Sequence, residues 1–395
     1  MKNKGTVKFA MLLLSVPSLC ADYYVSPRGA DSNPGTVKRP FRTIQRAANI
    51  VHAGDTVNVA DGTYNECNVS LNNSGTSNAP IRFQSQNKWG AKLAIPLSCD
   101  VGFNVRGSFV VIKNFDISGA GQPSSTGIFF NSGSNHTAFG NKIHNIANVV
   151  QNNLNGNVGI FVETANDLID SNVIFGIGRL PGSNTFNHDH GMYIDGSLGA
   201  AGTIVQNNLL YNNTVGYNIQ LYPGTLNNIL IVNNTIDATG SHNAGCMVQG
   251  GNLTNSRIAN NICTNPKGGV MIHNDCCGDT ASNVLIDHNI TSAPGMVELN
   301  NTYNIDSSNI FNANPSALFS NLGGNDYHLV ANSPAIGAGT SNRAPAIDFD
   351  GNARGRRKCV HCLPRTASTL SDLPNDYKGA APANPPCIGA FEYAP

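Results

Sequence analysis

The sequence predicts an all-β protein, a single-stranded right-handed parallel β-helix (solenoid) with an N-terminal capping helix and an irregular C-terminal segment. Three observations predict it: a repeat of about thirty residues with an asparagine at its corner, a glycine that opens a short strand in each repeat, and a low content of charge. Only 12% of the 395 residues are charged, whereas glycine occurs 41 times, which is unusual for an ordinary α/β enzyme.

Residues 1–21 predict a secretory signal peptide. Three lysines precede the apolar stretch Phe9–Val16, which is much shorter than the roughly 20 residues that a membrane span needs. We therefore expect a soluble, secreted protein, extracellular or periplasmic. The 24 basic and 24 acidic side chains balance, so we expect no nucleic-acid partner and no membrane partner, and we expect a monomer.

Ten cysteines in an exported chain favour disulfides over reduced thiols. Cys359 and Cys362 have the spacing of metal ligands, but no second Cys-x-x-Cys accompanies them, so a disulfide or a free thiol is favoured over zinc. The adjacent Cys276 and Cys277 can hardly bridge each other without strain. The connectivity cannot be deduced from the sequence.

Residues 22–65 are expected to form an N-terminal cap and the first strand. Apolar residues recur at helical spacing from Pro40 to Val51, and a strand is expected over 56–60. Solenoids need a cover over the open end of their core, and an amphipathic helix suits that task.

Residues 66–310 are expected to form the coils. A short apolar strand followed by asparagine recurs at intervals of 26 to 36 residues. Asparagine tolerates the left-handed conformation and can bond from coil to coil, so we assign the repeated asparagines to the scaffold. They are Asn114, Asn141, Asn172, Asn208, Asn234, Asn261 and Asn289.

A second strand in each coil begins with glycine and then alternates apolar and polar or aromatic residues. Because strand side chains alternate between faces, the aliphatic set is expected to point inward and the other set outward. The expected outward positions are Phe129, Asn131, Phe161, Glu163, Tyr193, Asp195, Asn218, Gln220, Met247, Gln249, Met271 and His273. Past about residue 300 the repeat fades, and residues 311–395 are expected to form a closing segment laid against the coils.

The sequence is similar to the pectate-lyase-like parallel β-helix superfamily at both ends. The opening Tyr23–Thr36, followed by Pro40–Ala47 and Ala53–Tyr64, resembles the entry segment of these proteins, and Ser333–Gly339, Asp348–Asn352 and Ile388–Tyr393 resemble their closing module. The resemblance implies the fold and a carbohydrate ligand. It leaves the reaction open, because the superfamily includes polysaccharide lyases, glycoside hydrolases, uronate epimerases and non-enzymatic binders.

The longest coil carries an insertion, residues 178–189, where solenoids often place function. It brings Arg179, His188 and His190 close to Tyr193 in sequence. His and Tyr can exchange protons near neutral pH, and Arg can hold a carboxylate. We take these four residues as the candidate catalytic set for β-elimination from an acidic, uronate-containing polysaccharide.

The outward aromatic and amide residues suit a long sugar chain. The candidate substrate-binding residues are Phe129, Phe161, Asn218, Gln220, Tyr222, Gln249 and His273. Glu163 and Asp195 are candidate ligands of Ca²⁺, as the resemblance to calcium-dependent lyases implies, or else the acid pair of a glycosidase. Two alternatives to the lyase remain: a hydrolase or uronate epimerase on the same fold, and a non-catalytic carbohydrate-binding or adhesion protein.

Overall fold

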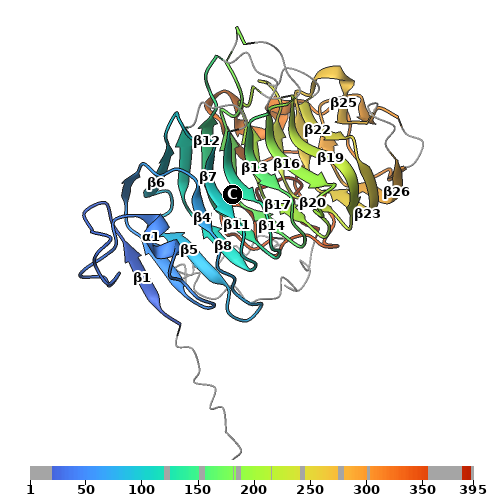
Figure 1. Ribbon diagram of the computed structural model, residues 1–395. Coiled ribbons are helices and arrows are strands. Elements are labelled where there is room, and N and C mark those ends of the chain that lie inside the picture. The colour runs from blue at the N-terminus through green and yellow to red at the C-terminus, as the bar shows by residue number, and fades with distance from the viewer. Residues whose placement is uncertain are drawn as a thin grey trace, which may run out of the picture.

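The computed structural model describes residues 20–119, 125–150, 156–180, 182–183, 188–214, 216–240, 245–274, 280–299, 303–354 and 385–392. This part of the chain is a parallel β-solenoid, in which strands of successive coils lie side by side (Figure 1). The predicted all-β solenoid is therefore confirmed. Nearly all of the predicted signal peptide lies outside the described residues, as do Cys276, Cys277, Cys359 and Cys362.

The coils build three parallel sheets, of which the first two share β19 and form one assembly of 20 strands, while the third has nine strands. The first sheet contains β4 (Val69–Leu71), β7 (Val101–Val105), β10 (Thr126–Phe130), β13 (Val158–Val162), β16 (His190–Gly196), β19 (Tyr217–Asn227), β22 (Gly245–Gln249), β25 (Val270–His273) and β28 (Gly295–Val297). The second contains β1 (Asp22–Val25), β2 (Thr56–Val59), β5 (Ile81–Ser85), β8 (Val110–Lys113), β11 (Thr137–Phe139), β14 (Leu168–Asp170), β17 (Ile204–Gln206), β20 (Leu230–Val232), β23 (Asn252–Ala259), β26 (Ala281–Asp287) and β29 (Tyr303–Ile305). The third contains β3 (Gly62–Tyr64), β6 (Ala91–Ile95), β9 (Asp116–Gly119), β12 (Lys142–Ile146), β15 (Val173–Phe175), β18 (Leu209–Tyr211), β21 (Thr235–Asp237), β24 (Ile262–Thr264) and β27 (Ile290–Thr291).

One apolar core runs through the stack because each strand sends aliphatic side chains inward. Ile128, Ile160, Met192 and Ile219 of the first sheet are each 0% exposed and occupy equivalent positions in four coils. The helix α1 (Ile44–Ala48) is shorter than the stretch with helical spacing, and it begins after Thr43, whose side chain accepts a hydrogen bond from the Arg46 amide. Within the described residues, no helix is both long enough and apolar enough to cross a membrane.

A buried ladder of asparagine side chains ties one coil to the next. In each step the Nδ2 group donates to the Oδ1 atom of the next asparagine at 2.9 to 3.1 Å, and it also donates to a backbone carbonyl. The ladder contains Asn141, Asn172, Asn208, Asn234, Asn261, Asn289 and Asn309.

The left-handed turn falls on the residue before every ladder asparagine except Asn309, as at Asn207 (φ 54°), Asn233 (φ 56°) and Asn260 (φ 56°). Asn114 is such a turn residue, with φ 62°, and it is not part of the ladder. The asparagines grouped together in the sequence pattern therefore have two different roles in the structure: some form the left-handed turn and others form the ladder.

The C-terminal segment docks on these turn residues. It contains the short helices η2 (Pro315–Ala317) and η3 (Leu322–Gly324) and the antiparallel hairpin β30 (Phe319–Asn321) and β31 (Asp326–Leu329), whereas η1 (Lys267–Gly269) lies in a coil. Asn233 Nδ2 donates to the carbonyls of Cys387 and Gly389, and the buried Arg354 donates to Asn207 Oδ1.

Two disulfides are present among the described residues, Cys67–Cys99 and Cys246–Cys263. Cys20 is an exposed free thiol, and Cys387 is buried. The expectation of disulfides rather than reduced thiols is thus confirmed for four of the ten cysteines, whereas the preference for a disulfide or free thiol over zinc at Cys359 and Cys362 falls outside the described residues.

Candidate active site

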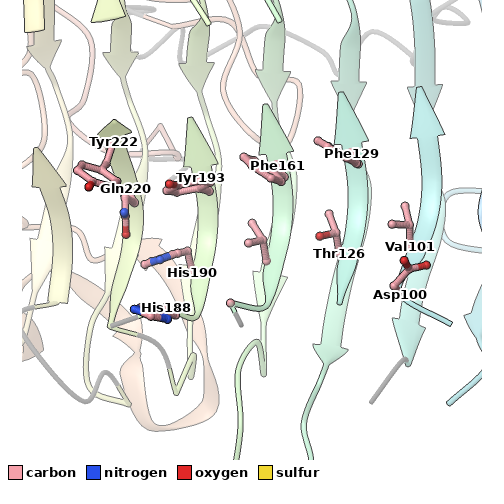
Figure 2. Close-up of a pocket in the computed structure, with 12 residues that line it drawn as sticks. Asp100, Val101, Thr126, Phe129, Phe161, His188, His190, Tyr193, Gln220 and Tyr222 are labelled. Carbon is pink, nitrogen blue, oxygen red and sulfur yellow. The ribbon is translucent and has the colours of Figure 1, made fainter. Parts of the chain in front are cut away.

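Glycines near the start of three strands of the first sheet change which side chains face outward. A Cβ on Gly159 would lie 2.5 Å from the Gly191 carbonyl oxygen and 3.0 Å from an Ile174 methyl group, so no side chain fits there. The residue before the glycine and the residue two places after it both line the outer face. This explains why His190 and Tyr193, three positions apart, point to the same side (Figure 2).

A pocket of about 480 Å³ lies on the outer face of the first sheet between β7 and β19. Its floor is built by equivalent positions of successive coils, so its length follows the stack of strands (Figure 2). The lining residues are Asp100, Val101, Thr126, Phe129, Gly156, Val158, Phe161, His188, His190, Tyr193, Gln220 and Tyr222.

An aromatic row forms part of this floor. The rings of Phe129 and Phe161 stack at 4.9 Å with planes 8° apart, and Tyr193 follows at 4.8 Å but is tilted by 49°. Parallel stacked rings cover each other's faces, so Phe129 and Phe161 present mainly their edges to the pocket. The Tyr193 ring is not parallel to the two phenylalanine rings, so the parallel stack ends at Tyr193.

His190 packs against Tyr193 and is buried. Their rings stack at 5.4 Å with planes 14° apart, and His190 is only 4% exposed. Burial lowers the pKa of His190 to about 3, despite the opposing effects of the Asp189 charge and a hydrogen bond to the Tyr217 backbone. His190 Nδ1 has no hydrogen-bond partner among the described residues. The imidazole is therefore neutral near pH 7 and is better suited to orienting Tyr193 than to exchanging protons.

The Tyr193 hydroxyl lies in the field of two carboxylates. Burial raises the pKa of Tyr193 well above its ordinary value, with further contributions from Asp195, Tyr222 and Glu163. Burial and the negative charge of Asp195 raise the pKa of Glu163 to about 7. At neutral pH the tyrosine thus keeps its proton, while Glu163 exchanges one readily.

Glu163 and Asp195 come from adjacent strands whose last paired residues are Val162 and Ile194. Asp195 Oδ1 accepts hydrogen bonds from the amide and hydroxyl of Ser197. Ca²⁺ takes six to eight oxygen ligands, and among the described residues no group of three or more His, Cys, Asp or Glu side chains is placed to hold a metal ion. The two carboxylates alone do not fit a protein-built calcium site, and we assign no catalytic step to a metal.

Arg179 does not face the pocket, contrary to the role predicted for it. It is 2% exposed and forms a two-pronged ion pair with Asp189, through Nε to Oδ2 at 2.8 Å and Nη2 to Oδ1 at 3.0 Å. Asp189 Oδ1 also accepts bonds from the backbone amide and side chain of Asn157. Because the guanidinium is buried against Asp189, it cannot hold a substrate carboxylate; it fixes the chain between His188 and His190.

Several residues predicted to face outward point inward because two later glycines are not equivalent to Gly191. The register pairs His190 with Tyr217 and Tyr217 with Gly245, so Asn218 occupies the glycine position and is 0% exposed. The same slip of one residue turns Met247 and Gln249 inward, with exposures of 0% and 1%. Gln249 instead bonds the Thr280 carbonyl and the Tyr303 hydroxyl.

The remaining predicted residues are divided between the pocket and its surroundings. Phe129, Phe161, Gln220 and Tyr222 line the pocket, with His188 exposed at its edge. His273 lies in the outward row that contains Gln220, but it is outside the pocket and pairs with Glu298 at 3.0 Å. Met271 is 0% exposed and does not face outward.

Sequence analysis missed five lining residues: Asp100, Val101, Thr126, Gly156 and Val158. Thr126 and Val158 each precede a strand glycine and are equivalent to His190 in register. The position before the glycine was therefore the available signal. Asp100 and Gly156 lie outside the strands, where the repeat does not show which residues face outward.

Fold and site together define a parallel β-solenoid with an aromatic pocket on one sheet and two carboxylates from adjacent strands beside it. Residues 23–219 match the family model described as Pel9A-like, right handed beta helix region. This matched part of the chain belongs to the Pel9A-like right-handed β-helix family. The crystal structure of pectate lyase Pel9A has the same fold, with a TM-score of 0.59 at 16% identity over 95% of this chain and 97% of that one.

Two curated relatives match over short stretches. Over 65 residues the chain is 46% identical to the uncharacterized protein YwoF of Bacillus subtilis (strain 168), which covers 16% of this chain and 14% of YwoF. Over 81 residues it is 41% identical to pectate lyase PEL9 of Emericella nidulans, which covers 20% of this chain and 19% of that enzyme. The aligned stretches thus span less than a fifth of either relative.

Proposed function

We propose that the protein is a secreted polysaccharide lyase that cleaves an acidic, uronate-containing polysaccharide by β-elimination. The observation that carries the proposal is the protonated Tyr193 hydroxyl at the pocket floor, in the field of Glu163, whose pKa is about 7. A weak acid and a poised base close together are what an elimination requires. Two similar proteins, PEL9 of Emericella nidulans and Pel9A, are pectate lyases, which supports the same class of reaction.

In the proposed mechanism, ionised Glu163 removes the proton from C5 of the uronate. The electron pair forms the C4–C5 double bond, the C4–O4 bond breaks, and Tyr193 donates its proton to the departing O4. Gln220 and His188 line the pocket and hold the substrate carboxylate by hydrogen bonds, which lowers the charge at C5 during proton removal. His190 holds the Tyr193 ring by stacking.

A requirement for Ca²⁺ is a separate proposal, because the two carboxylates are too few ligands to support it by themselves. If Glu163 and Asp195 bind Ca²⁺, the substrate and solvent must supply most of its ligands. Activity measured with a chelator and with added Ca²⁺ decides this: loss with the chelator and recovery with Ca²⁺ would establish a metal requirement.

Hydrolysis is the second candidate reaction, and the spacing of the two carboxylates favours it. Glu163 and Asp195 extend from adjacent strands, which lie about 4.8 Å apart at the backbone. Retaining glycosidases use two carboxyl groups about 5 Å apart. In that case Glu163, with its raised pKa, would protonate the glycosidic oxygen and Asp195 would be the nucleophile.

One experiment separates these candidates. The purified protein is incubated with polygalacturonate, alginate and glycosaminoglycans, and both ultraviolet absorbance and reducing ends are followed. Unsaturated, absorbing products support elimination, whereas reducing ends without absorbance indicate hydrolysis. Glycan binding with neither product, unchanged in Tyr193→Phe, would establish a non-catalytic binder instead.

Secretion belongs to the same proposal. The two disulfides fit an oxidising compartment, and the N-terminal lysines and apolar stretch predict export. Recovery of the protein from the culture medium or periplasm, with its N-terminus cleaved near residue 21, is the expected result.

A further inference from the structure

The charge of the chain is unevenly distributed. Residues 82–142 contain six Lys and Arg against two Asp, a net charge of +4, although the whole chain has a formal net charge of zero. These residues form β5 to β12, so the excess positive charge belongs to the first coils. The proposed substrate is a polyanion, and this is the part of the solenoid that complements it in charge.

The single tryptophan of the chain lies in this region, between lysines. Trp89 has the ammonium groups of Lys88 and Lys142 at 4.7 and 5.3 Å from its ring centre. Its indole Nε1 donates to the Gly140 carbonyl at 2.8 Å, and its amide donates to the Asn114 carbonyl at 2.7 Å. The ring is therefore fixed to two neighbouring coils.

The backbone of Trp89 is left-handed, with φ 66°. Such a conformation is a genuine outlier for a bulky residue. Strained residues persist where the surroundings hold them, and they concentrate at binding sites. Here the strained conformation presents a half-buried indole beside two ammonium groups.

Two further cations, Lys113 and Arg82, lie on the adjacent strands β8 and β5 of the second sheet, and two acids lie beside the lysines. Lys113 lies 5.6 Å from the ring centre of Phe139, and it and Arg82 are close enough for their positive charges to repel. Lys142 is paired with Asp116 at 2.6 Å, and Asp116 also bonds His144 at 2.8 Å. Asp350 of the C-terminal segment also interacts electrostatically with Lys88, whose ammonium group lies 5.0 Å from the Phe349 ring centre. The two acids offset two of the four cations and leave the patch positive.

We propose that Trp89, Lys88, Lys142, Lys113 and Arg82 form an auxiliary binding site for acidic polysaccharide, separate from the pocket. The ammonium and guanidinium groups meet the uronate carboxylates, and the indole packs against a sugar ring. None of the five residues lines the pocket of the first sheet. The choice of ligand rests on the proposed substrate class, but binding at this site requires no catalysis.

The single tryptophan makes the site directly observable. Intrinsic fluorescence is followed while polygalacturonate is added at low salt, and methyl-esterified polygalacturonate, which has the same backbone without the charge, serves as the neutral comparison. We expect a saturable change with the acidic polymer only. We also expect affinity to fall at least tenfold when salt rises from about 50 to 200 mM, because exposed charges are screened.

Lys88→Gln and Lys142→Gln test the assignment, with Lys267→Gln, an exposed lysine outside the patch, as the matched control. Each patch variant should weaken polymer binding at least fivefold while Lys267→Gln leaves it unchanged. No fluorescence change with any acidic polymer, an equal change with the neutral polymer, or unchanged affinity in both patch variants would overturn the proposal. A Tyr193→Phe variant that has lost activity but still binds separates this site from the proposed reaction.

Discussion

Two rows of rings run along the same three coils, one on the first sheet and one on the third. On the first, Phe129, Phe161 and Tyr193 are spaced at 4.9 and 4.8 Å. On the third, the rings of His144, Phe175 and Tyr211 are spaced at 4.9 and 5.1 Å with planes within 10° of parallel. A regular solenoid places equivalent side chains of successive coils at the spacing of the strands. Ring stacking therefore follows from the repeat and does not by itself indicate a functional site.

The rows differ in what lies at their ends. The first ends on the tilted Tyr193, beside two carboxylates and an open pocket. The third ends on Tyr327 of the C-terminal hairpin, at 5.4 Å from Tyr211, and the Tyr327 hydroxyl donates to Asp237. We therefore expect function on the first sheet, where the row of rings departs from the repeat. The row on the third sheet is covered by the C-terminal hairpin and contributes to the packing of that segment.

The largest effect on stability is expected at the ion pair beneath the pocket. Arg179→Met leaves buried Asp189 without its cation and should lower the free energy of unfolding by about 3–5 kcal/mol. Lys142→Met, at the more exposed pair on the third sheet, should cost about 1 kcal/mol or less. Urea unfolding of the two variants checks this prediction. Equal losses in the free energy of unfolding would contradict the expected difference between the buried and the exposed ion pair.

The next largest effect on stability is expected in the asparagine ladder, which connects the coils that carry both rows. Asn208→Ala removes side-chain bonds to Asn234 and to two carbonyls and leaves buried groups unpaired, at about 1–3 kcal/mol. Asn304→Ala, at an exposed position of β29, should change stability by less than about 0.5 kcal/mol. If the two variants unfold at the same urea concentration, the ladder does not have the role assigned to it.

The carboxylates should make the first sheet sensitive to pH. Folded Glu163 keeps its proton up to a pKa of about 7, whereas the unfolded chain releases it near 4.5. Between those values the folded state binds more protons, so this group lowers stability as pH rises from about 4.5 to 7. Burial also raises the pKa of Asp167 to about 7, so Glu163→Gln should make the decline smaller without abolishing it. Asp195→Asn should shift the Glu163 contribution to lower pH, and both variants are measured by urea unfolding from pH 4 to 8. An undiminished decline in Glu163→Gln would contradict the raised pKa of Glu163.

The smallest effect is expected from the rings themselves. Phe161→Leu should weaken polymer binding severalfold, since an aromatic contact contributes about 0.5–1.5 kcal/mol, while the equivalent Phe175→Leu on the third sheet leaves binding unchanged. Isothermal titration with the active polymer compares them. Equal weakening would mean that both rows contact the polymer.

The sequence predicted the solenoid, its ladder and much of the pocket because these follow from repetition. Phe161, Tyr193 and Gln220 could be placed because each coil copies the one before it. The prediction was wrong at Gln249, where a slip of one residue between coils reversed the face. It was also wrong for Arg179, because no local pattern shows that Asp189, ten residues later, holds its guanidinium.

The most direct test of the account is a comparison of Tyr193→Phe with Tyr211→Phe on a polymer that the wild-type protein cleaves. Each variant loses one hydroxyl from the third ring of its row, on β16 and β18 of the same coil. We predict that Tyr193→Phe lowers kcat by about 10²-fold or more, as expected for loss of a general acid, and that Tyr211→Phe stays within twofold of wild type. Full activity in Tyr193→Phe, or equal losses in both, would contradict the assignment of the reaction to this pocket.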